Sequence, residues 1–261
     1  ICITIKLKKS GFIFMLLVTS GLALKSTLPE NFVFLTDIDP TIIENSRYYT
    51  DQNFLARQVI GYNTPRIICT KEAALKLKEA NEDLKKDGYK FVVYDGYRPQ
   101  EAVDEFARWS VDINDQVAKE YYYPTLNKKD VFKLGYIAKR SGHSRGSTFD
   151  LTLIETSKIL RPIAITKRIL QNGETIPFLD DNTIDMGSSF DLFHQVSNHG
   201  SNLVNNEHNE NRELLKVIMK KHGFNDYQKE WWHYTLENEP YKTTYVRRAW
   251  CKSWGLKSPM G

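Results

Sequence analysis

Two short stretches of the sequence contain side chains that could bind a divalent metal ion. The first, S-G-H-S-R-G-S-T-F-D-L-T-L at residues 141–153, places His143 and Asp150 seven positions apart, with Gly146 between them to allow a turn. The second stretch, E-W-W-H, ends at His233. Two imidazoles and a carboxylate with an open fourth position form the arrangement of catalytic zinc sites. The spacing therefore predicts one Zn²⁺ site built from both stretches.

A hydrolytic metal site also needs a base, and Glu230 is the candidate. Metal coordination lowers the pKa of water from about 15.7 toward about 7, which provides hydroxide at neutral pH. Glu230 precedes His233 by three positions, so the two side chains share a side in a turn-like or helical backbone but not in an extended strand. From there Glu230 could take the proton of the water and pass it to a leaving amine.

Arg98 is the candidate for stabilising negative charge that develops during a reaction. It belongs to D-G-Y-R-P, at the corner between an apolar strand and a helix that opens at Pro99. A fixed guanidinium in a cleft stabilises an oxyanion well. The alternative is a surface arginine bonded to a nearby carboxylate. We expect Trp231 and Trp232 to pack around the site.

Each histidine also has a structural alternative, because an isolated histidine is more often structural than a ligand. The constellation of a His-x6-Asp motif followed by E-x-x-H carries the metal prediction. Four histidines lack such neighbours and are expected in loops or on helices: His194, His199, His208 and His222.

Hydrophobic periodicity predicts the elements that position these residues. We expect strands at 31–36, 90–94, 149–154, 224–228 and 234–236. We expect helices from a Thr70 cap to Gly88, from Pro99 onward, over one or two turns at 128–136, and around 214–219 up to Gly223. Loops are expected at 121–124 and through the Asn-rich stretch to Asn211, with a small hairpin within 155–185.

Composition favours one soluble domain without a nucleic-acid partner. The chain has 261 residues, of which 41% are hydrophobic and 26% charged, and a formal net charge of +4. Four lysines that precede residue 26 account for that excess, so the remainder is about neutral and provides no electrostatic footprint for nucleic acid. Without internal repeats or linkers, we expect residues 26–261 to form a single domain.

Residues 1–25 are interpreted as a signal peptide that directs the protein to the periplasm or outside the cell. The segment from Lys6 to Lys9 would form the positive region, and residues 11–24 the apolar region. An uncleaved anchor and a buried helix are the alternatives, although the apolar run is short for a membrane span, which needs about 20 residues. In an oxidising compartment Cys69 and Cys251 could pair, but sequence separation does not establish this.

The motifs together resemble those of the D-alanyl-D-alanine dipeptidases, a family of zinc peptidases. The shared motifs are S-x-H-S-R-G-S-x-x-D-L-T-L, D-G-Y-R-P, M-G-x-x-F-D and E-W-W-H-Y, in the family's order from about Phe32 to Tyr241. The resemblance implies an α+β fold with a central antiparallel sheet flanked by helices, shared with D,D-carboxypeptidases and the hedgehog signalling domain. It also implies hydrolysis of the free dipeptide D-Ala-D-Ala, a small-molecule substrate.

The resemblance assigns the same roles as the residues themselves: zinc ligands His143, Asp150 and His233, general base Glu230 and transition-state stabiliser Arg98. It adds Asp191, Ser141 and Tyr48 as positions that hold the substrate's ammonium group. An acceptor cluster would offset the hydration that this amine loses. Alternatives remain: a loop hydroxyl bonding the backbone for Ser141, and core packing for Tyr48.

Three departures from the family's compact members bear on physiological role. The signal places the enzyme outside the cytoplasm, which favours turnover of cell-wall peptides over antibiotic resistance; a cytoplasmic location is the alternative. An insertion around 156–184 could form a rim over the cleft, and the tail at 243–261 is extended. Two other functions stay open: a D,D-carboxypeptidase or endopeptidase acting on longer wall peptides, and a zinc-bearing module that binds wall fragments without hydrolysis.

Overall fold

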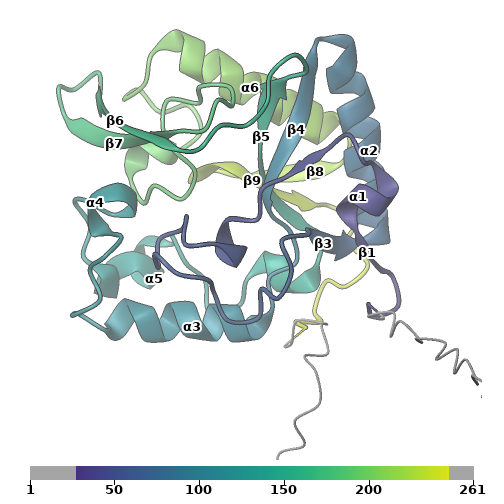
Figure 1. Cartoon of the computed structure of the whole chain (residues 1–261), viewed down its shortest axis with the longest axis horizontal. Helices are drawn as coiled ribbons and strands as arrows, with labels where there is room; N and C mark the ends of the chain where they lie inside the picture. Colours follow the sequence, from purple (N-terminus) through teal and green to yellow (C-terminus); the bar gives the residue numbers. More distant parts are fainter. Residues whose placement is uncertain (1–27, 247–261) are drawn as a thin grey trace, which may run out of the picture.

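The computed structural model describes residues 28–246, which form a mixed α+β fold around a five-stranded sheet (Figure 1). The sheet order is β2 (Ile43–Glu44), β4 (Tyr89–Asp95), β5 (Thr148–Glu155), β9 (Glu230–Leu236) and β8 (Phe224–Tyr227). Neighbouring strands are antiparallel except β2 and β4, which are parallel. The prediction of an antiparallel sheet is therefore wrong at this edge, because a helical crossover joins these two strands.

Two long helices pack on the central sheet, and a third lies apart from them. Helix α2 (Lys71–Lys86) packs on β4, α6 (Asn206–Lys221) packs on β8 and β9, and α2 and α6 contact each other. Helix α3 (Gln100–Val111) runs along the bottom of Figure 1, away from both. The shorter helices are α1 (Leu35–Ile38), α4 (Lys119–Tyr122) and α5 (Val131–Leu134), and the 3-10 turns are η1 (Arg47–Tyr49), η2 (Lys128–Asp130), η3 (Gly142–Arg145) and η4 (Gln195–Ser197).

Helix α2 shows how closely local sequence specifies an element. The Thr70 hydroxyl accepts the backbone N–H of Ala73 and caps the helix, as predicted. The chain leaves the helix through Gly88, whose φ of +83° favours glycine. One side of the helix is fully buried through Ala73, Leu77, Ala80 and Leu84. The apolar residues predicted to recur along this helix are therefore the ones on the face that packs on the sheet.

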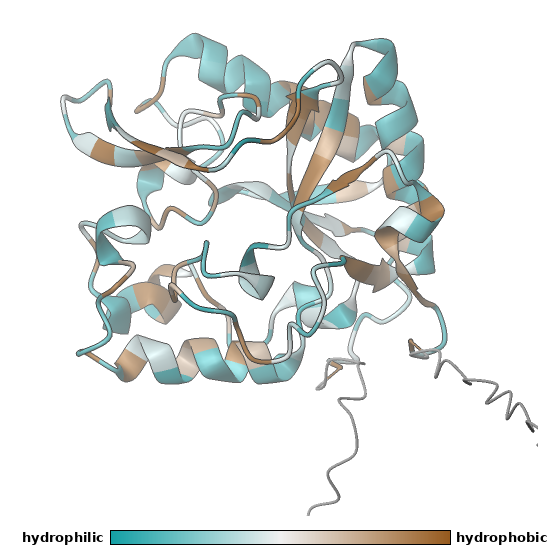
Figure 2. Cartoon of the chain, viewed as in Figure 1, coloured by the Kyte–Doolittle hydropathy of each residue, from teal (hydrophilic) through white to brown (hydrophobic). Residues whose placement is uncertain are grey.

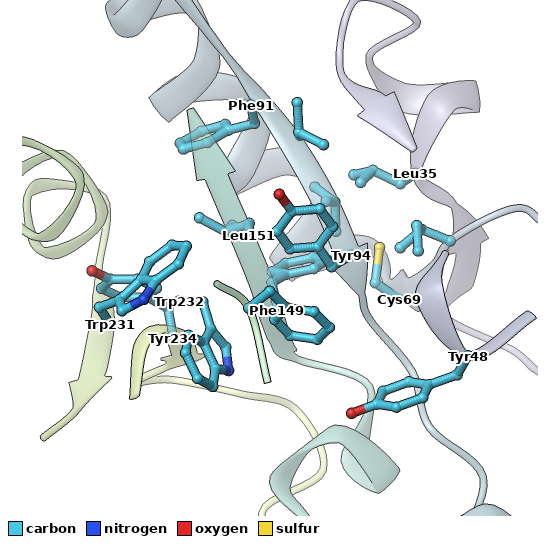
Figure 3. Close-up of a cluster of buried hydrophobic side chains, with 14 of the residues drawn as sticks. Leu35, Tyr48, Cys69, Phe91, Tyr94, Phe149, Leu151, Trp231, Trp232 and Tyr234 are labelled. Atoms are coloured by element: carbon cyan, nitrogen blue, oxygen red, sulfur yellow. The ribbon is translucent and has the colours of Figure 1, made fainter. Parts of the chain in front are cut away.

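The main core lies between the sheet and its helices. Hydrophobic colour concentrates on β4 and β5 in Figure 2, whereas the outer faces of α2 and α6 are hydrophilic. Figure 3 shows Phe149 and Leu151 from β5 in one buried cluster with Trp232 and Tyr234 from β9. Successive residues of β5 point to opposite faces, so Asp150 lies on the face opposite to these two apolar side chains.

Two smaller sheets flank the central one. Strands β1 (Phe32–Phe34) and β3 (Ile68–Thr70) pair antiparallel, and so do β6 (Ala164–Ile169) and β7 (Thr175–Asp180). The β6–β7 pair is the small hairpin expected within 155–185. It projects at the left of Figure 1, where β7 contacts α4.

Two predicted loops contain helix. Helix α4 includes residues 121 and 122 of the loop predicted at 121–124, and α6 begins at Asn206 although we predicted loop up to Asn211. The Asn205 side chain caps α6 by accepting the N–H of His208. Arg212 anchors the same helix through bonds to three backbone carbonyls, which sequence periodicity does not reveal.

Several expectations concern residues outside the described range. The signal peptide at 1–25 and the tail beyond residue 246 lie there, as does Cys251. Its pairing with Cys69, which is buried, therefore stays a prediction.

Candidate active site

Three neighbouring strands bring acidic and imidazole side chains to one place. Asp150 on β5 lies opposite His233 on β9, so their side chains stand side by side on one face. On its other side Asp150 lies opposite Asp95 of β4, where a register shift after Val93 turns Asp95 toward the same face. The sheet thus supplies a rigid base for the site.

Strand β9 is irregular where it carries the E-W-W-H motif. Asp226 pairs with Tyr234, but the next residue, Tyr227, pairs with Glu230, so β9 has extra residues at this point. We expected the motif to lie between two short strands, and the structure instead places it inside β9. The irregularity lets residues three apart share a side, and Glu230 Oε2 lies 3.4 Å from His233 Nδ1.

His143 reaches the sheet from η3. Its Nδ1 lies 2.8 Å from the backbone carbonyl of Gly96, which can only accept, so Nδ1 carries a proton and Nε2 is the nitrogen whose lone pair a metal would bind. The Ser141 hydroxyl accepts the backbone N–H of His143 and caps the turn. Gly146 closes the turn with φ +85°, and a Cβ there would lie 2.4 Å from the Phe32 ring.

The predicted ligand atoms converge at one point. His143 Nε2 lies 3.2 Å from Asp150 Oδ1 and 3.3 Å from His233 Nδ1, and these last two atoms are 3.1 Å apart. Tetrahedral ligands at about 2.0 Å from zinc would be about 3.3 Å from one another. Within residues 28–246 the buried Asp150 Oδ1 has no hydrogen-bond donor. The three residues therefore fit a small divalent cation, and within residues 28–246 they form the group of side chains that could hold one.

The pKa shifts of Asp150 and His233 suit metal binding. Burial opposes the charge on Asp150, but the neighbouring His143 and His233 outweigh it and hold its pKa below the usual value. Burial lowers the pKa of His233 despite its contact with Asp150, which favours the neutral imidazole that metals bind.

Arg98 is largely enclosed beside this group, with a side chain that is only 12% exposed, and is not a surface residue. Its Nε donates to Asp95 Oδ2 at 2.9 Å, and its Nη2 donates to Asp150 Oδ2 at 3.3 Å. The guanidinium also lies 4.9 Å from the centre of the Tyr48 ring. These contacts fix the side chain at the wall of the cavity.

Asp95 is a residue of this site that the sequence analysis missed. Its Oδ1 accepts from the Tyr62 hydroxyl and from the Gly96 amide, and its Oδ2 accepts from Arg98. His143 Nδ1 lies 3.4 Å from Asp95 Oδ2. Such outer carboxylates orient metal-binding imidazoles. Its place as the first residue of D-G-Y-R-P was the available signal.

Asp191 and Tyr48 form a second buried pair across the cavity. The Tyr48 hydroxyl donates to Asp191 Oδ2 at 2.7 Å, and Asp191 adopts a left-handed backbone with φ +59°. Burial raises the pKa of Asp191 to about 8, with a further contribution from Asp150. Burial also raises the pKa of Glu230 well above its usual value, with Asp150 and then Asp191 adding to the effect.

The Asp191 carboxyl should make the metal-free protein less stable at high pH. Its pKa is raised from about 3.9 unfolded to about 8 folded, so the folded state holds its proton more tightly and stability is lost as pH rises between these values. We expect Asp191→Asn to raise the melting temperature relative to wild type by a few degrees (about 3 °C or more) at pH 8 and by less at pH 5. A melting-temperature gain that is equal at both pH values would contradict this assignment.

These residues line one cavity of about 220 Å³. Its walls bring together the eight residues predicted for the site with the aromatic side chains of Phe54, Phe106, Tyr136 and Phe193. Ligand sites for drug-sized molecules are about 300–1,000 Å³, so this cavity suits a smaller ligand. The other histidines, His194, His199, His208 and His222, lie outside it.

The arrangement defines a class of protein. A His-Asp-His group that fits a divalent ion, with a buried glutamate beside it in a small cavity, is the arrangement of a metallopeptidase. A family model described as D-ala-D-ala dipeptidase, of the peptidase M15 type, matches residues 29–161 and 176–250. The chain belongs to this metal-dependent family.

The chain is similar to individual D-alanyl-D-alanine dipeptidases over most of their length. The chain is 38% identical to the D-alanyl-D-alanine dipeptidase of Enterococcus faecalis, over 85% of this chain and 99% of the relative. It is 36% identical to the enzyme of that name from Enterococcus faecium, over 82% and 95%. It is 37% identical to the one from Streptomyces coelicolor, over 82% and 96%.

Proposed function

We propose that this protein is a zinc peptidase that hydrolyses free D-alanyl-D-alanine to two molecules of D-alanine. The observation that carries the proposal is the convergence of three ligand atoms within 3.3 Å of one another at the cavity wall, beside a buried glutamate. Membership of the dipeptidase family supports the same activity.

His143, Asp150 and His233 would hold one Zn²⁺ per chain. Two neutral imidazoles and a carboxylate suit zinc, and three protein ligands leave a position open for water. When bound, zinc supplies a water of lowered pKa and polarises the substrate carbonyl. Asp95 would keep the His143 ring oriented through its contact with Nδ1.

Glu230 would transfer the proton during hydrolysis. Its Oε2 is 3.4 Å from His233 Nδ1 and therefore lies beside the group that would hold the metal. A carboxylate there can take a proton from the attacking water and deliver it to the leaving amine. The burial that raises its pKa helps Glu230 to hold the proton between these two steps.

Arg98 would stabilise the negative charge that develops on the carbonyl oxygen. Its contacts with Asp95 and Asp150 hold the guanidinium in one orientation before the substrate arrives. A donor that is already oriented needs no reorganisation when the charge appears.

Asp191 would bind the ammonium group of the dipeptide, with Tyr48 and Ser141 beside it. Tyr48 is only 1% exposed and its hydroxyl is committed to Asp191, so it would act by holding that carboxylate. Ser141 lines the cavity and its hydroxyl accepts from His143, which leaves its own proton to donate.

Recognition of a free amine provides a test of this assignment. We expect N-acetyl-D-Ala-D-Ala to be hydrolysed with a kcat/KM about 10³-fold or more below that of the free dipeptide, because the blocked amine leaves the buried Asp191 carboxylate without a cationic partner. Initial rates on both substrates give the ratio of the two kcat/KM values, and Asp191→Asn should bring these two values closer together. Equal kcat/KM values would instead support a D,D-carboxypeptidase or endopeptidase. Metal-loaded protein that hydrolyses no D,D-peptide would support a binding module.

We infer a role in turnover of cell-wall peptides, in the periplasm or outside the cell. The basis is the signal-like composition of residues 1–25, and a cytoplasmic enzyme is the alternative. Within residues 28–246, no helix combines the length and apolar character needed to cross a bilayer.

We also infer that the fold is the one shared by D,D-carboxypeptidases and the hedgehog signalling domain. The support is the antiparallel core of the sheet, β4-β5-β9-β8, with the candidate metal ligands on its central strands and on η3.

A further inference from the structure

A buried carboxylate outside the catalytic cavity accepts hydrogen bonds from three side chains. Asp181 is 4% exposed and accepts from Arg47 Nη2 at 2.5 Å, from the Tyr94 hydroxyl at 2.8 Å and from the Thr183 hydroxyl at 2.7 Å. Arg47 is equally buried and its guanidinium lies 4.7 Å from the centre of the Tyr94 ring. A buried ion pair is weak evidence for stability, because desolvation offsets much of its attraction. Stability alone therefore does not account for this buried pair.

Two of these partners of Asp181, Arg47 and Tyr94, are connected to the proposed amine pocket. Arg47 directly precedes Tyr48 in η1, and the Tyr48 hydroxyl donates to Asp191. Tyr94 stacks on Phe190, with ring centres 4.8 Å apart, and Phe190 directly precedes Asp191. The Asp181 carboxylate is thus connected, through these two partners, to both the donor and the acceptor of the Tyr48–Asp191 hydrogen bond.

The same residue fixes the end of the β6–β7 hairpin. Asp181 follows β7, and its backbone carbonyl accepts the N–H of Arg161 ahead of β6, which closes the base of the hairpin. The family model leaves residues 162–175 unmatched, which covers β6 and the hairpin turn. Asp181 therefore joins a segment outside the family match to the elements around Asp191.

We propose that Asp181 is a positioning residue that sets the affinity for the substrate's ammonium group. It acts through Arg47 and Tyr94, which hold Tyr48 and Phe190 and so orient the Asp191 carboxylate. The inference rests on the proposed function. It predicts an effect on substrate binding and none on the proton transfer at Glu230, because Asp181 contacts neither Glu230 nor the metal ligands.

The test is a split between KM and kcat for D-Ala-D-Ala. In Asp181→Asn we expect KM to rise about tenfold, because small misplacements of a binding group are costly, while kcat stays within about twofold. Asp180→Asn is the matched control, since the Asp180 side chain is 41% exposed and adjacent in sequence, and its KM should not change. Tyr94→Phe keeps the ring on Phe190, removes one donor to Asp181, and should raise KM about threefold.

A double variant with Asp191→Asn distinguishes a positioning role of Asp181 from a general loss of structure. In that background Asp181→Asn should change kcat/KM by less than about twofold, because the group it orients is gone. Unchanged KM in folded Asp181→Asn, or an undiminished effect in the Asp191→Asn background, would overturn the inference. If Asp181→Asn does not fold, unchanged KM in Tyr94→Phe overturns it. Wild-type turnover of D-Ala-D-Ala is measured first, so that a failure of the proposed function is seen separately.

Discussion

Replacing Glu230 with glutamine is expected to lower kcat for D-Ala-D-Ala by about 10³-fold or more, because general acid–base catalysis contributes roughly 10²–10⁴-fold and two proton transfers depend on this residue. Glutamine has nearly the same shape but cannot take a proton from water. It also removes a buried acid whose pKa is raised by burial and by Asp150. The variant should therefore fold at least as stably as wild type.

The measurement combines steady-state kinetics with metal analysis of the same sample. We expect Glu230→Gln to keep one metal ion per chain, because Glu230 is not among the three converging ligand residues. Glu237→Gln, an exposed glutamate at the end of β9, is the matched control and should retain wild-type kcat. Loss of the metal together with activity would show that Glu230 is a ligand, and retained activity would remove it from the proton-transfer role.

Local sequence was sufficient to predict several of the elements around the site. The apolar period of α2, its Thr70 cap and the glycine that ends it all act over a few residues, so they can be read without knowledge of the fold. The β4 strand and the helix after Pro99 follow for the same reason. Helix α6 was predicted too short because Arg212 stabilises it through carbonyls on distant segments.

The meeting of His143, Asp150 and His233 could be predicted only through the motifs together. Asp150 and His233 are 83 positions apart in sequence, and the antiparallel register of β5 and β9 makes them neighbours. The register itself could not be derived from one sequence. The two motifs together indicated the three ligands, the family resemblance assigned the same residues, and the structure places all three at one point.

The position of Glu230 depends on backbone irregularity that no periodicity encodes. In a regular strand Glu230 and His233 would point to opposite faces. The shift between Asp226 and Tyr227 in the pairing of β8 with β9 brings them together. The comparable shift between Val93 and Asp95 in β4 explains why Asp95 was missed.

Removal of the metal should abolish hydrolysis of D-Ala-D-Ala, with a loss of about 10³-fold or more, because the attacking water then loses its lowered pKa. The three ligand atoms would also face one another without a cation between them. One equivalent of Zn²⁺ should restore the rate in wild type. Zn²⁺ should not restore the rate in His233→Ala. The control variant His222→Ala alters a histidine at the end of α6, and its rate should recover fully.

The most direct test of the account is therefore the rate of free D-Ala-D-Ala hydrolysis by wild-type protein before chelation, after chelation and after addition of one equivalent of Zn²⁺. We predict D-alanine release that is lost on chelation and regained at a stoichiometry of one zinc ion per chain. Turnover that persists in metal-free protein, or its absence from fully zinc-loaded protein, would contradict the assignment of His143, Asp150 and His233 as the zinc site of a dipeptidase.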